Sequence, residues 1–380
     1  MLSPLRCLLI LLVFVLSLHL ILSAVHEDYA KLSSLANLTS GFQKSLSNTT
    51  PDVDAYDPSL YPSIPQSDRR ANATFVFLCR NNDLSGVISS VRQMEDRFNR
   101  RYNYPWVFLN EEPFTEVFKE RVRVLTDAPV SFGLIPNQSW YQPDWIDEEK
   151  AKEGREKMMA QGIIYAGSVP YRNMCRFNSG FFFQHELLQP YKYYWRVEPD
   201  VQYFCDVVYD PFILMEDQKK VYGFTIALLE WHATIPTLWD SVKKFISQNP
   251  QYIEPQNAMD LISGDGGDTY NLCHFWSNFE IADMDFWRGE AYQKFFEFLD
   301  STGGFYYERW GDAPVHSIAA ALFARRDQLH FFRDIGYKHD SFQHCPTGSE
   351  WIRGRCSCDP LDTFDYAYGS CIQRYEDMFS

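Results

Sequence analysis

The sequence predicts an α/β fold with a largely parallel sheet and a C-terminal region held together by disulfides. Apolar strand-like segments alternate with amphipathic helix-like segments through most of the chain, which is typical of parallel sheets. The 380 residues are 46% apolar and 17% aromatic, enough to bury a large core. Four of the nine cysteines lie between residues 345 and 371, where they can cross-link a short segment.

The first half of this domain is predicted to have a β-α-β-α-β order. Residues 73–79 and 106–109 are apolar enough for buried strands, and residues 84–102 between them repeat apolar side chains at helical spacing. Residues 114–121 predict a short helix and residues 122–125 a third strand. This order predicts parallel pairing of the strands.

The second half mixes strands and helices. From residue 345 onward we expect loops tied by cysteines, and the size of the domain, residues 71–380, favours two tightly packed lobes within it. Arg80 directly follows the first strand, where ligands bind in such sheets. The further elements predicted are helices at 148–161, 237–247, 290–300 and 314–324 and strands at 191–197 and 221–229.

The N-terminal residues predict a membrane anchor. Residues 7–25 are almost entirely apolar and long enough to span a bilayer as a helix. Arg6 precedes this run and two acidic residues follow it, so the positive-inside bias predicts a cytosolic tail at 1–6 and a luminal body. A cleaved signal peptide is the alternative, but the run is long for one and lacks a good cleavage site. Residues 26–70 are rich in Ser, Asn, Pro and Asp and predict a luminal stem.

Two further features favour a luminal body. Eight cysteines follow the anchor, and an even number in an oxidising compartment suggests disulfides. Cys356 and Cys358 are spaced wrongly for a usual zinc pair, so a cross-linked C-terminal subdomain is the better interpretation. Four N-glycosylation acceptors are present, at Asn37, Asn48, Asn72 and Asn137.

The charge balance argues against nucleic acid as a partner. The formal net charge is −15, from 50 acidic and 35 basic residues, and no basic stripe runs along the sequence. Nucleic-acid-binding domains normally carry such a stripe. The acidic excess itself predicts a soluble surface and says nothing about the substrate.

Two carboxylates follow the apolar strand at 191–197. Glu198 and Asp200 are two positions apart, so on an extended chain they point the same way. Such a pair can hold a hard divalent cation, which then bridges the phosphates of a nucleotide. The triplet is common by chance, and an ordinary loop is the alternative.

Other candidate residues lie further along the chain. Residues 270–281 mix aromatic side chains, which suit sugar rings or a plain core, with Glu280, which could be a nucleophile, a base or a surface acid. Asp312 precedes a predicted helix and could be a helix cap or a second reactive carboxylate. His339 has an imidazole available for a metal, although an isolated histidine is usually not a ligand.

Together these segments resemble the fungal α-1,2-mannosyltransferases of glycosyltransferase family 15. The similarity runs from about residue 70 to the C-terminus, and the membrane anchor fits the family as well. The short stem, which brings the site close to the membrane, is the one departure. The matching motifs are YNLCHFWSNFEI at 270–281, RVEPD at 196–200, YRNMCRF at 171–177 and RWGDAPVH at 309–316.

The resemblance implies a GT-A-like fold with a twisted mixed sheet, GDP-mannose as donor and Mn²⁺ as metal. It implies a type II Golgi membrane protein whose residues 71–380 form the catalytic domain, acting on mannosylated glycoprotein acceptors. Glu198 and His339 become metal ligands, and Asp200 lies near the metal or the nucleotide. Complexes with other Golgi mannosyltransferases are left open.

The resemblance also implies retention of the α configuration, with Glu280 as the candidate nucleophile. Tyr171 then lies beside the reacting sugar, Asp312 is a second nearby carboxylate, and Arg80 and Arg196 face the nucleotide phosphates. A covalent route through Glu280 and a same-face substitution both remain open, and an electrostatic role for Glu280 is slightly favoured.

Two other functions remain as alternatives. A metal-independent glycoside hydrolase could use Glu280 and Asp312 as its carboxylate pair. A non-catalytic mannan-binding protein would need none of the carboxylates. The choice between O-linked and N-linked acceptors is left open, and the α-1,2 linkage rests wholly on the resemblance.

Overall fold

The structure, a computed structural model, describes residues 69–379. The predicted tail, the anchor at 7–25 and nearly all of the stem lie outside these residues. Within 69–379, no helix is long and apolar enough to cross a membrane. The chain divides into two compact units, and the larger, residues 62–346 and 350–380, contains the sheet and the site described below.

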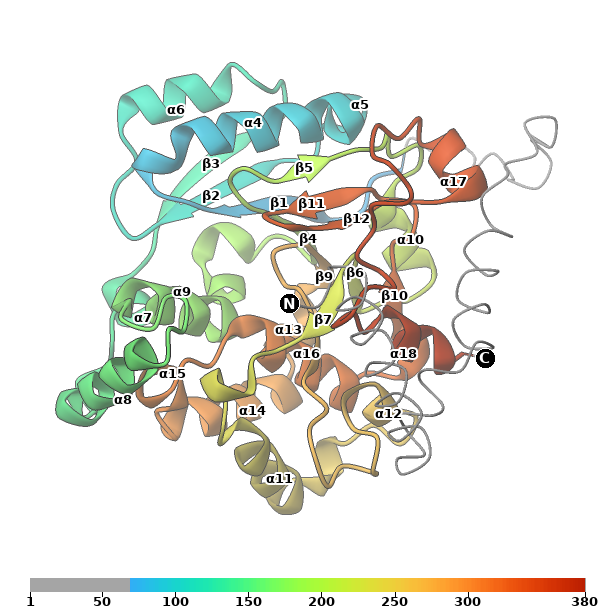
Figure 1. Cartoon of the computed structure of the whole chain (residues 1–380). Helices are drawn as coiled ribbons and strands as arrows, with labels where there is room; N and C mark the ends of the chain where they lie inside the picture. Colours follow the sequence, from blue (N-terminus) through green and yellow to red (C-terminus); the bar gives the residue numbers. More distant parts are fainter. Residues whose placement is uncertain (1–68, 380) are drawn as a thin grey trace, which may run out of the picture. The chain divides into compact units, whose positions relative to one another are not determined.

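A seven-stranded mixed sheet forms the centre of this unit (Figure 1). Strand β9 runs antiparallel to both β4 and β6, and the other four pairings are parallel. The sheet is therefore mixed and largely parallel, as predicted. Its order is β10 (Leu329–Phe331), β6 (Tyr222–Phe224), β9 (Glu280–Asp283), β4 (Tyr193–Val197), β1 (Ala73–Leu78), β2 (Trp106–Asn110) and β3 (Val130–Leu134).

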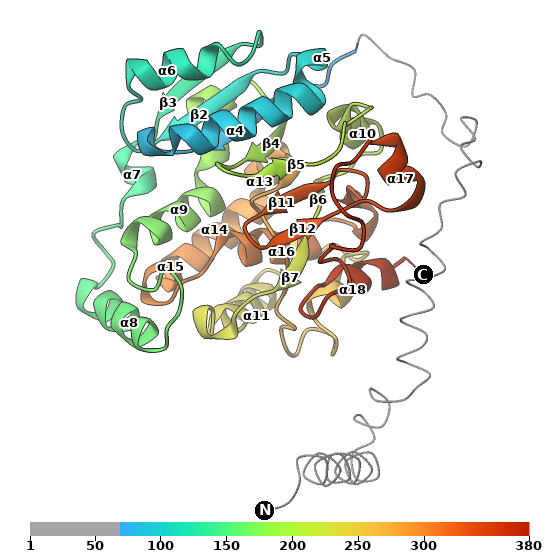
Figure 2. The same ribbon diagram turned by 45° about the horizontal axis from the view of Figure 1, so that its top comes forward.

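Both faces of the sheet are covered because its strands are apolar on both sides. In β1, Phe75 and Phe77 pack into one core cluster, whereas Val76 between them packs into the other. Helices α4 (Leu84–Met94), α6 (Glu116–Arg123) and α10 (Pro211–Asp217) contribute to the first cluster. The second cluster includes residues of α9 (Val169–Gly180), α14 (Glu290–Ser301) and α16 (Asp312–Phe323), which lie on the opposite side in Figures 1 and 2.

The remaining helices are short or peripheral. Helix α4 continues through a π-helical turn (Glu95–Asn99) into α5 (Arg100–Tyr102). The others are α7 (Asn137–Trp140), α8 (Glu148–Ala160), α11 (Leu238–Gln248), α12 (Met259–Ile262), α13 (Met284–Arg288), α15 (Gly304–Tyr307), α17 (Gly348–Arg353) and α18 (Ile372–Asp377).

Two predicted strands differ from the observed ones. The strand expected at 122–125 is wrong, because Val122 is buried on the apolar face of α6 and that helix continues to Arg123. The strand expected at 221–229 is two strands, β6 and β7 (Ala227–Leu229). They belong to different sheets, because β7 pairs with β8 (Cys273–Phe275) rather than continuing in the central sheet.

The C-terminal region is more regular than expected. Strands β11 (Tyr337–His339) and β12 (Phe342–His344) form a hairpin, and β11 also pairs with β5 (Gln202–Tyr203) (Figure 2). The predicted disulfides are present and involve all four C-terminal cysteines. They are Cys205–Cys356, Cys273–Cys371 and Cys345–Cys358, while Cys79 and Cys175 are buried thiols.

Candidate active site

The site begins with two neighbouring strands of the central sheet. Arg196 on β4 and Glu280 on β9 are directly opposite each other in the antiparallel register. Directly opposite residues project to the same face of a sheet, so the sheet itself brings these two side chains together. Both are buried. Glu198 follows one residue after β4 ends.

Arg196 connects three carboxylates that are distant in the sequence. Its Nη1 donates to Oδ2 of Asp312 at 2.6 Å, and its Nη2 donates to Oε1 of Glu198 at 2.5 Å. The same Nη1 lies 3.5 Å from Oε1 of Glu280. Burial disfavours the charged guanidinium, but the three carboxylates outweigh it and raise the pKa of Arg196 further. One buried cation is therefore shared among three anions.

Asp312 is held from two sides. It lies in the first turn of α16, where the positive end of the helix dipole favours a carboxylate. The hydroxyl of Ser277 donates to the same Oδ2 that Arg196 contacts, at 2.8 Å. Asp312 is thus part of the Arg196 cluster rather than a simple helix cap, and no side-chain cap hydrogen bond is present at this helix start.

Glu280 lies deeper than the sequence suggested. Its side chain is fully buried, and Arg196 is its charged neighbour toward the cavity described below. Oε2 of Glu280 lies 2.8 Å from Nδ1 of His316, and Nε2 of His316 lies 3.0 Å from the carbonyl oxygen of Asn178. His316 ends the motif at 309–316, and no role in the site was predicted for it from the sequence.

Glu198, directly after β4, lies close to His339 on β11 of the small sheet. Nε2 of His339, on β11, lies 3.4 Å from Oε2 of Glu198. Burial alone would raise the pKa of Glu198, but its interactions with Arg196 and His339 outweigh burial and lower the pKa to about 2. Burial also disfavours a charged His339, yet the carboxylates of Glu198 and Asp340 outweigh it and raise the pKa of His339.

The side chains of Glu198 and His339 fit two ligand positions of a divalent cation whose other ligands are not these two residues. Ligands about 2.1 Å from an octahedral ion lie about 3 Å from each other, close to the separation of these two atoms. Nδ1 of His339 is buried and makes no hydrogen bond within the described residues. Residues 69–379 contain no group of three His, Cys, Asp or Glu side chains that could hold a metal. Glu198 and His339 are therefore two adjacent candidate ligands.

Asp200 does not point the same way as Glu198. The chain turns after β4, and Asp200 adopts a left-handed φ of 60° rather than an extended conformation. It is exposed, and its carboxylate lies directly over Gly86 of α4. The premise of two parallel carboxylates on an extended chain is therefore wrong, and Asp200 does not line the cavity.

A cavity of about 310 Å³ opens beyond the carboxyl ends of β1 and β4. Arg80 lies in it and forms an ion pair with Glu111, with Nε 2.7 Å from the carboxylate. Four of the residues predicted from the sequence thus meet here: Arg80, Tyr171, Arg196 and Glu198. The other lining residues are Leu78, Cys79, Asp83, Glu111, Trp140, Tyr165, Ser168, Pro170, Met174 and Pro199.

Tyr171 is fixed at the wall of this cavity by its neighbours. It lies at the start of α9, whose first turn is capped by the Ser168 hydroxyl. Its ring stacks on Tyr165 with centroids 4.6 Å apart, and the Arg309 guanidinium lies 5.1 Å from its centroid. The nearby Cys175 thiol and burial raise the pKa of Tyr171 well above its usual range, so its hydroxyl stays protonated.

Sequence analysis did not single out several residues that complete the site. Ser277 lies in the same motif as Glu280, and His316 lies in the same motif as Asp312. This closeness in the sequence was the available signal that they belong to the site. Tyr165 is an aromatic residue with a left-handed φ of 57°, a property that only the backbone reveals. Glu111 follows the second strand just as Arg80 follows the first. This equivalent position at a strand end could have indicated Glu111 as a residue of the site.

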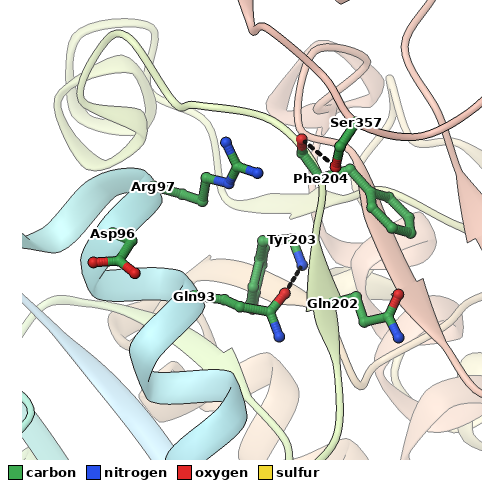
Figure 3. A pocket seen from close by; sticks show the side chains of 7 residues that line it. All are labelled: Gln93, Asp96, Arg97, Gln202, Tyr203, Phe204 and Ser357. Atoms are coloured by element: carbon green, nitrogen blue, oxygen red, sulfur yellow. Dashed lines mark hydrogen bonds between the residues drawn. The ribbon is translucent and has the colours of Figure 1, made fainter.

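A second cavity, of about 360 Å³, lies between the π-helical turn after α4, strand β5 and the C-terminal segment (Figure 3). The side chains around it are mostly polar, and Gln93 accepts a hydrogen bond from the backbone of Tyr203. None of the residues predicted to carry chemistry lines it. We therefore assign the candidate active site to the first cavity.

Comparison with known proteins gives consistent matches over most of the chain. The family described as Glycolipid 2-alpha-mannosyltransferase matches residues 34–380. Glycolipid 2-alpha-mannosyltransferase 2 of Candida albicans is 54% identical over 312 residues, which cover 82% of this chain and 68% of that protein. The O-glycoside alpha-1,2-mannosyltransferase omh1 of Schizosaccharomyces pombe is 50% identical over 312 residues, covering 82% of this chain and 80% of that protein.

Two solved structures match the fold. Core-mannan synthase A (CmsA/Ktr4) from Aspergillus fumigatus, described as a Mn/GDP form, matches with a TM-score of 0.77 and 44% identity over 81% of this chain and 85% of that chain. The mannosyltransferase Ktr4p from S. cerevisiae, in complex with GDP, matches with a TM-score of 0.78 and 40% identity over 83% of each chain.

Proposed function

This chain belongs to the fungal α-1,2-mannosyltransferases of glycosyltransferase family 15, and we propose that it transfers mannose from GDP-mannose to the terminal mannose of glycoprotein glycans. The acceptors proposed are O-linked chains, N-linked chains or both. The observation that carries this proposal is the meeting of Arg80, Tyr171, Arg196 and Glu198 at one cavity beyond the carboxyl ends of β1 and β4. Nucleotide ligands bind at this edge of open α/β sheets.

We assign the diphosphate of the donor to the part of this cavity that Arg80 and Arg196 line. Arg80 and Arg196 present guanidinium groups there, and a planar fork of donors suits phosphate oxygens. Two solved relatives are described as GDP-bound, which supports the same nucleotide here. Asp200 is exposed over α4 and does not line the cavity, so we give it no role in binding the donor.

Glu198 and His339 would hold the divalent metal, with Mn²⁺ the favoured ion. The bound ion would offset the negative charge that develops on the leaving GDP. Their separation suits adjacent ligands of one ion, and the Mn/GDP form of a relative supports the choice of metal. The low pKa of Glu198 keeps this carboxylate ionised and ready to bind a cation at neutral pH.

The carboxylate cluster suits the positive charge that the sugar develops as its bond to GDP breaks. Glu198, Glu280 and Asp312 share the single guanidinium of Arg196, so the cluster carries excess negative charge. Such fixed charge stabilises an oxocarbenium-like transition state without rearrangement. Tyr171 at the cavity wall offers a protonated hydroxyl next to the sugar.

The burial of Glu280 favours same-face substitution over a covalent intermediate. A nucleophile must reach the anomeric carbon, but Glu280 is fully buried with Arg196 between it and the cavity. In the same-face route the C1–O bond to GDP breaks, and the acceptor hydroxyl bonds to C1 from the same side. Its proton passes to the departing phosphate, and Glu280 acts through its charge.

The proposed setting is the Golgi membrane, with a type II anchor and a luminal catalytic domain. The apolar run at 7–25 supports an anchor, and the three disulfides support an oxidising compartment. A glycoside hydrolase is not favoured, because its two candidate carboxylates, Glu280 and Asp312, are both engaged by one arginine.

The test is a transfer assay with the purified chain, GDP-mannose and methyl α-mannoside, with Mn²⁺ or with EDTA. We expect an α-1,2-linked disaccharide that disappears with EDTA and in Glu198→Ala and falls about 100-fold or more in Glu280→Gln. Glu297→Gln, an exposed carboxylate on α14, is the matched control and should retain activity. Binding of GDP-mannose without transfer would point to another acceptor, and neither binding nor transfer would refute the proposal.

A further inference from the structure

His316 lies next to Glu280, and both of its ring nitrogens face hydrogen-bond acceptors. A neutral imidazole beside an ionised carboxylate cannot make both of these hydrogen bonds. The ring is fully buried, with Nδ1 2.8 Å from Oε2 of Glu280 and Nε2 3.0 Å from the carbonyl oxygen of Asn178. A carbonyl only accepts hydrogen bonds, and an ionised carboxylate does too. Both ring nitrogens must then donate, which only the imidazolium form can do. The other possibility places the shared proton on Glu280.

The surrounding charges favour the proton on His316. Three carboxylates meet one guanidinium at Arg196, and Glu280 and Asp312 among them are buried, where uncompensated charge is costly. A second cation beside Glu280 reduces this excess. The guanidinium 3.5 Å from Oε1 also stabilises the ionised form of Glu280. A carboxylic acid is moreover the stronger acid of the two groups.

Packing holds the His316 ring in place. His316 lies four residues after Asp312 on α16, so one face of this helix carries both side chains into the cluster. The ring stacks on the indole of Trp287 with centroids 4.4 Å apart. A ring held on its face and at both nitrogens has little freedom to turn away from Glu280.

The two oxygens of Glu280 differ as a result. Oε2 is occupied by His316, whereas Oε1 is buried and meets no partner at hydrogen-bond geometry within residues 69–379. The Tyr222 hydroxyl is nevertheless close to Glu280, since its pKa is raised by burial and also by this carboxylate. Oε1 is the oxygen nearest Arg196, which lines the cavity. We propose that His316 is a positioning residue, whose imidazolium holds Oε2 so that Glu280 stays ionised with Oε1 on the side of Arg196, which lines the cavity. This inference rests on the proposed function, in which Glu280 faces the sugar's positive charge.

Two substitutions separate this role from simple packing. The side-chain nitrogen of asparagine can take the place of Nδ1 and still donate to Glu280, whereas that of glutamine takes the place of Nε2 and leaves Glu280 without a donor. We expect His316→Asn to keep kcat within about tenfold of the wild type and His316→Gln to lose about 100-fold, with KM for GDP-mannose unchanged in both. A purely structural role predicts the reverse order, because glutamine fills the space better, and that order would overturn the proposal.

His344 provides a matched control within the same chain. Its Nδ1 lies 2.8 Å from Asp365 and its Nε2 3.0 Å from the carbonyl oxygen of Arg333, the same pattern as at His316. It is buried at the open end of the β11–β12 hairpin, away from the turn that follows His339. His344→Gln should leave kcat unchanged. An equal loss of kcat in His344→Gln and His316→Gln would mean that the effect is one of stability and would contradict the proposal.

A measurement on the wild-type chain keeps the inference testable if the variants fail to fold. In ¹⁵N-histidine-labelled protein at pH 7, both ring nitrogens of His316 should show the shifts of protonated nitrogens, with the signal identified by its change in Glu280→Gln. One unprotonated ring nitrogen would refute the proposal. This readout needs no activity, so it stays decisive even if the wild type transfers no mannose and the proposed function fails.

Discussion

At the scale of single residues, Arg196 has the widest influence on the site. It was expected only to face the nucleotide phosphates, but it also joins Glu198, Glu280 and Asp312. These carboxylates come from three separate parts of the sequence. Removing this guanidinium leaves three carboxylates without their shared partner in a mostly buried place, so its effect on folding should be large.

We expect Arg196→Met to lower the free energy of unfolding by about 3–5 kcal/mol, because breaking a buried ion pair leaves uncompensated charge. Urea unfolding of the two proteins measures the difference. Arg325→Met is the control, since Arg325 forms an exposed pair with Asp327 and its loss should cost no more than about 1 kcal/mol. Equal effects of the two substitutions would contradict the view of Arg196 as the centre of a buried cluster.

His344 predicts a pH dependence of stability. Burial disfavours its charged form, but the Asp365 carboxylate outweighs burial and raises the pKa of His344 above its usual 6.5. The folded chain therefore holds this proton more tightly than the unfolded chain does. The stabilisation is complete below about pH 6.5 and is lost as the pH rises through the raised pKa.

The measurement is the free energy of unfolding across this range for the wild type and for His344→Gln. We expect the wild type to lose more stability than the variant as the pH rises above about 6.5. Parallel curves for the two proteins would show that His344 titrates alike in the folded and unfolded states.

The limits of sequence analysis at this scale are visible at Asp200 and His316. Alternation along an extended strand placed Asp200 beside Glu198, but a left-handed turn that only the folded chain reveals moves it over Gly86. His316 looked like an ordinary part of a helix. Its role emerges only when β9 brings Glu280 to it from 36 residues away.

At the scale of elements, regular apolar patterns predicted helices and strands reliably. Predictions failed where one segment was compatible with both a helix and a strand. The strands at β1, β2 and β4 were found because their residues are apolar and buried on both faces. Residues 122–125 were predicted to be a strand because three of the four, Val122, Val124 and Leu125, are apolar. Val122 instead follows Phe118 at helical spacing, and the buried face of α6 decides the outcome.

Helix α9, which carries Tyr171, was not predicted. Its twelve residues include two arginines and two asparagines, so no apolar stripe marks it in the sequence. Partners from other elements engage these polar groups: Arg176, for example, forms a bidentate ion pair with Asp300 of α14. Pairings between distant elements of this kind cannot be read from local spacing.

The contact between α9 and α14 yields a prediction about Gly180. A methyl group at this position would come within 2.0 Å of the Phe296 ring, which is buried. We expect Gly180→Ala to destabilise the protein by about 1–3 kcal/mol through overpacking. Chemical unfolding measures this, and Gly264→Ala, where nothing lies within 4 Å, should change stability by less than about 0.5 kcal/mol. A neutral Gly180→Ala would mean that the two helices can separate freely.

At the scale of the whole molecule, the GT-A-like fold was predictable and the cysteine pairing was not. The alternation of elements and the family resemblance fixed the sheet and its faces. Disulfide partners depend on which loops meet in space, so Cys205 could not be linked to Cys356 from the sequence. For the disulfides, the sequence offered two signals: the number of cysteines and their grouping near the C-terminus.

The disulfides should differ in their contribution to stability. Cys273–Cys371 closes a separation of 98 residues and Cys345–Cys358 one of 13. Chain entropy predicts that replacing the first pair by serines costs about 2 kcal/mol more than replacing the second. Urea unfolding of the two double variants tests this, and an equal or reversed order would show that native-state contacts outweigh loop closure.

The long-range pairing of Cys205 also sets an order of events during biosynthesis. Glu198 leaves the ribosome early, but His339 follows it only 141 residues later, and the bond from Cys205 to Cys356 later still. Until then Cys205 and Cys273 are thiols without their partners, open to pairing with each other or with chaperone oxidoreductases. A nascent chain halted before residue 339 has the strand that presents Glu198 but lacks His339, the second ligand of the proposed metal site.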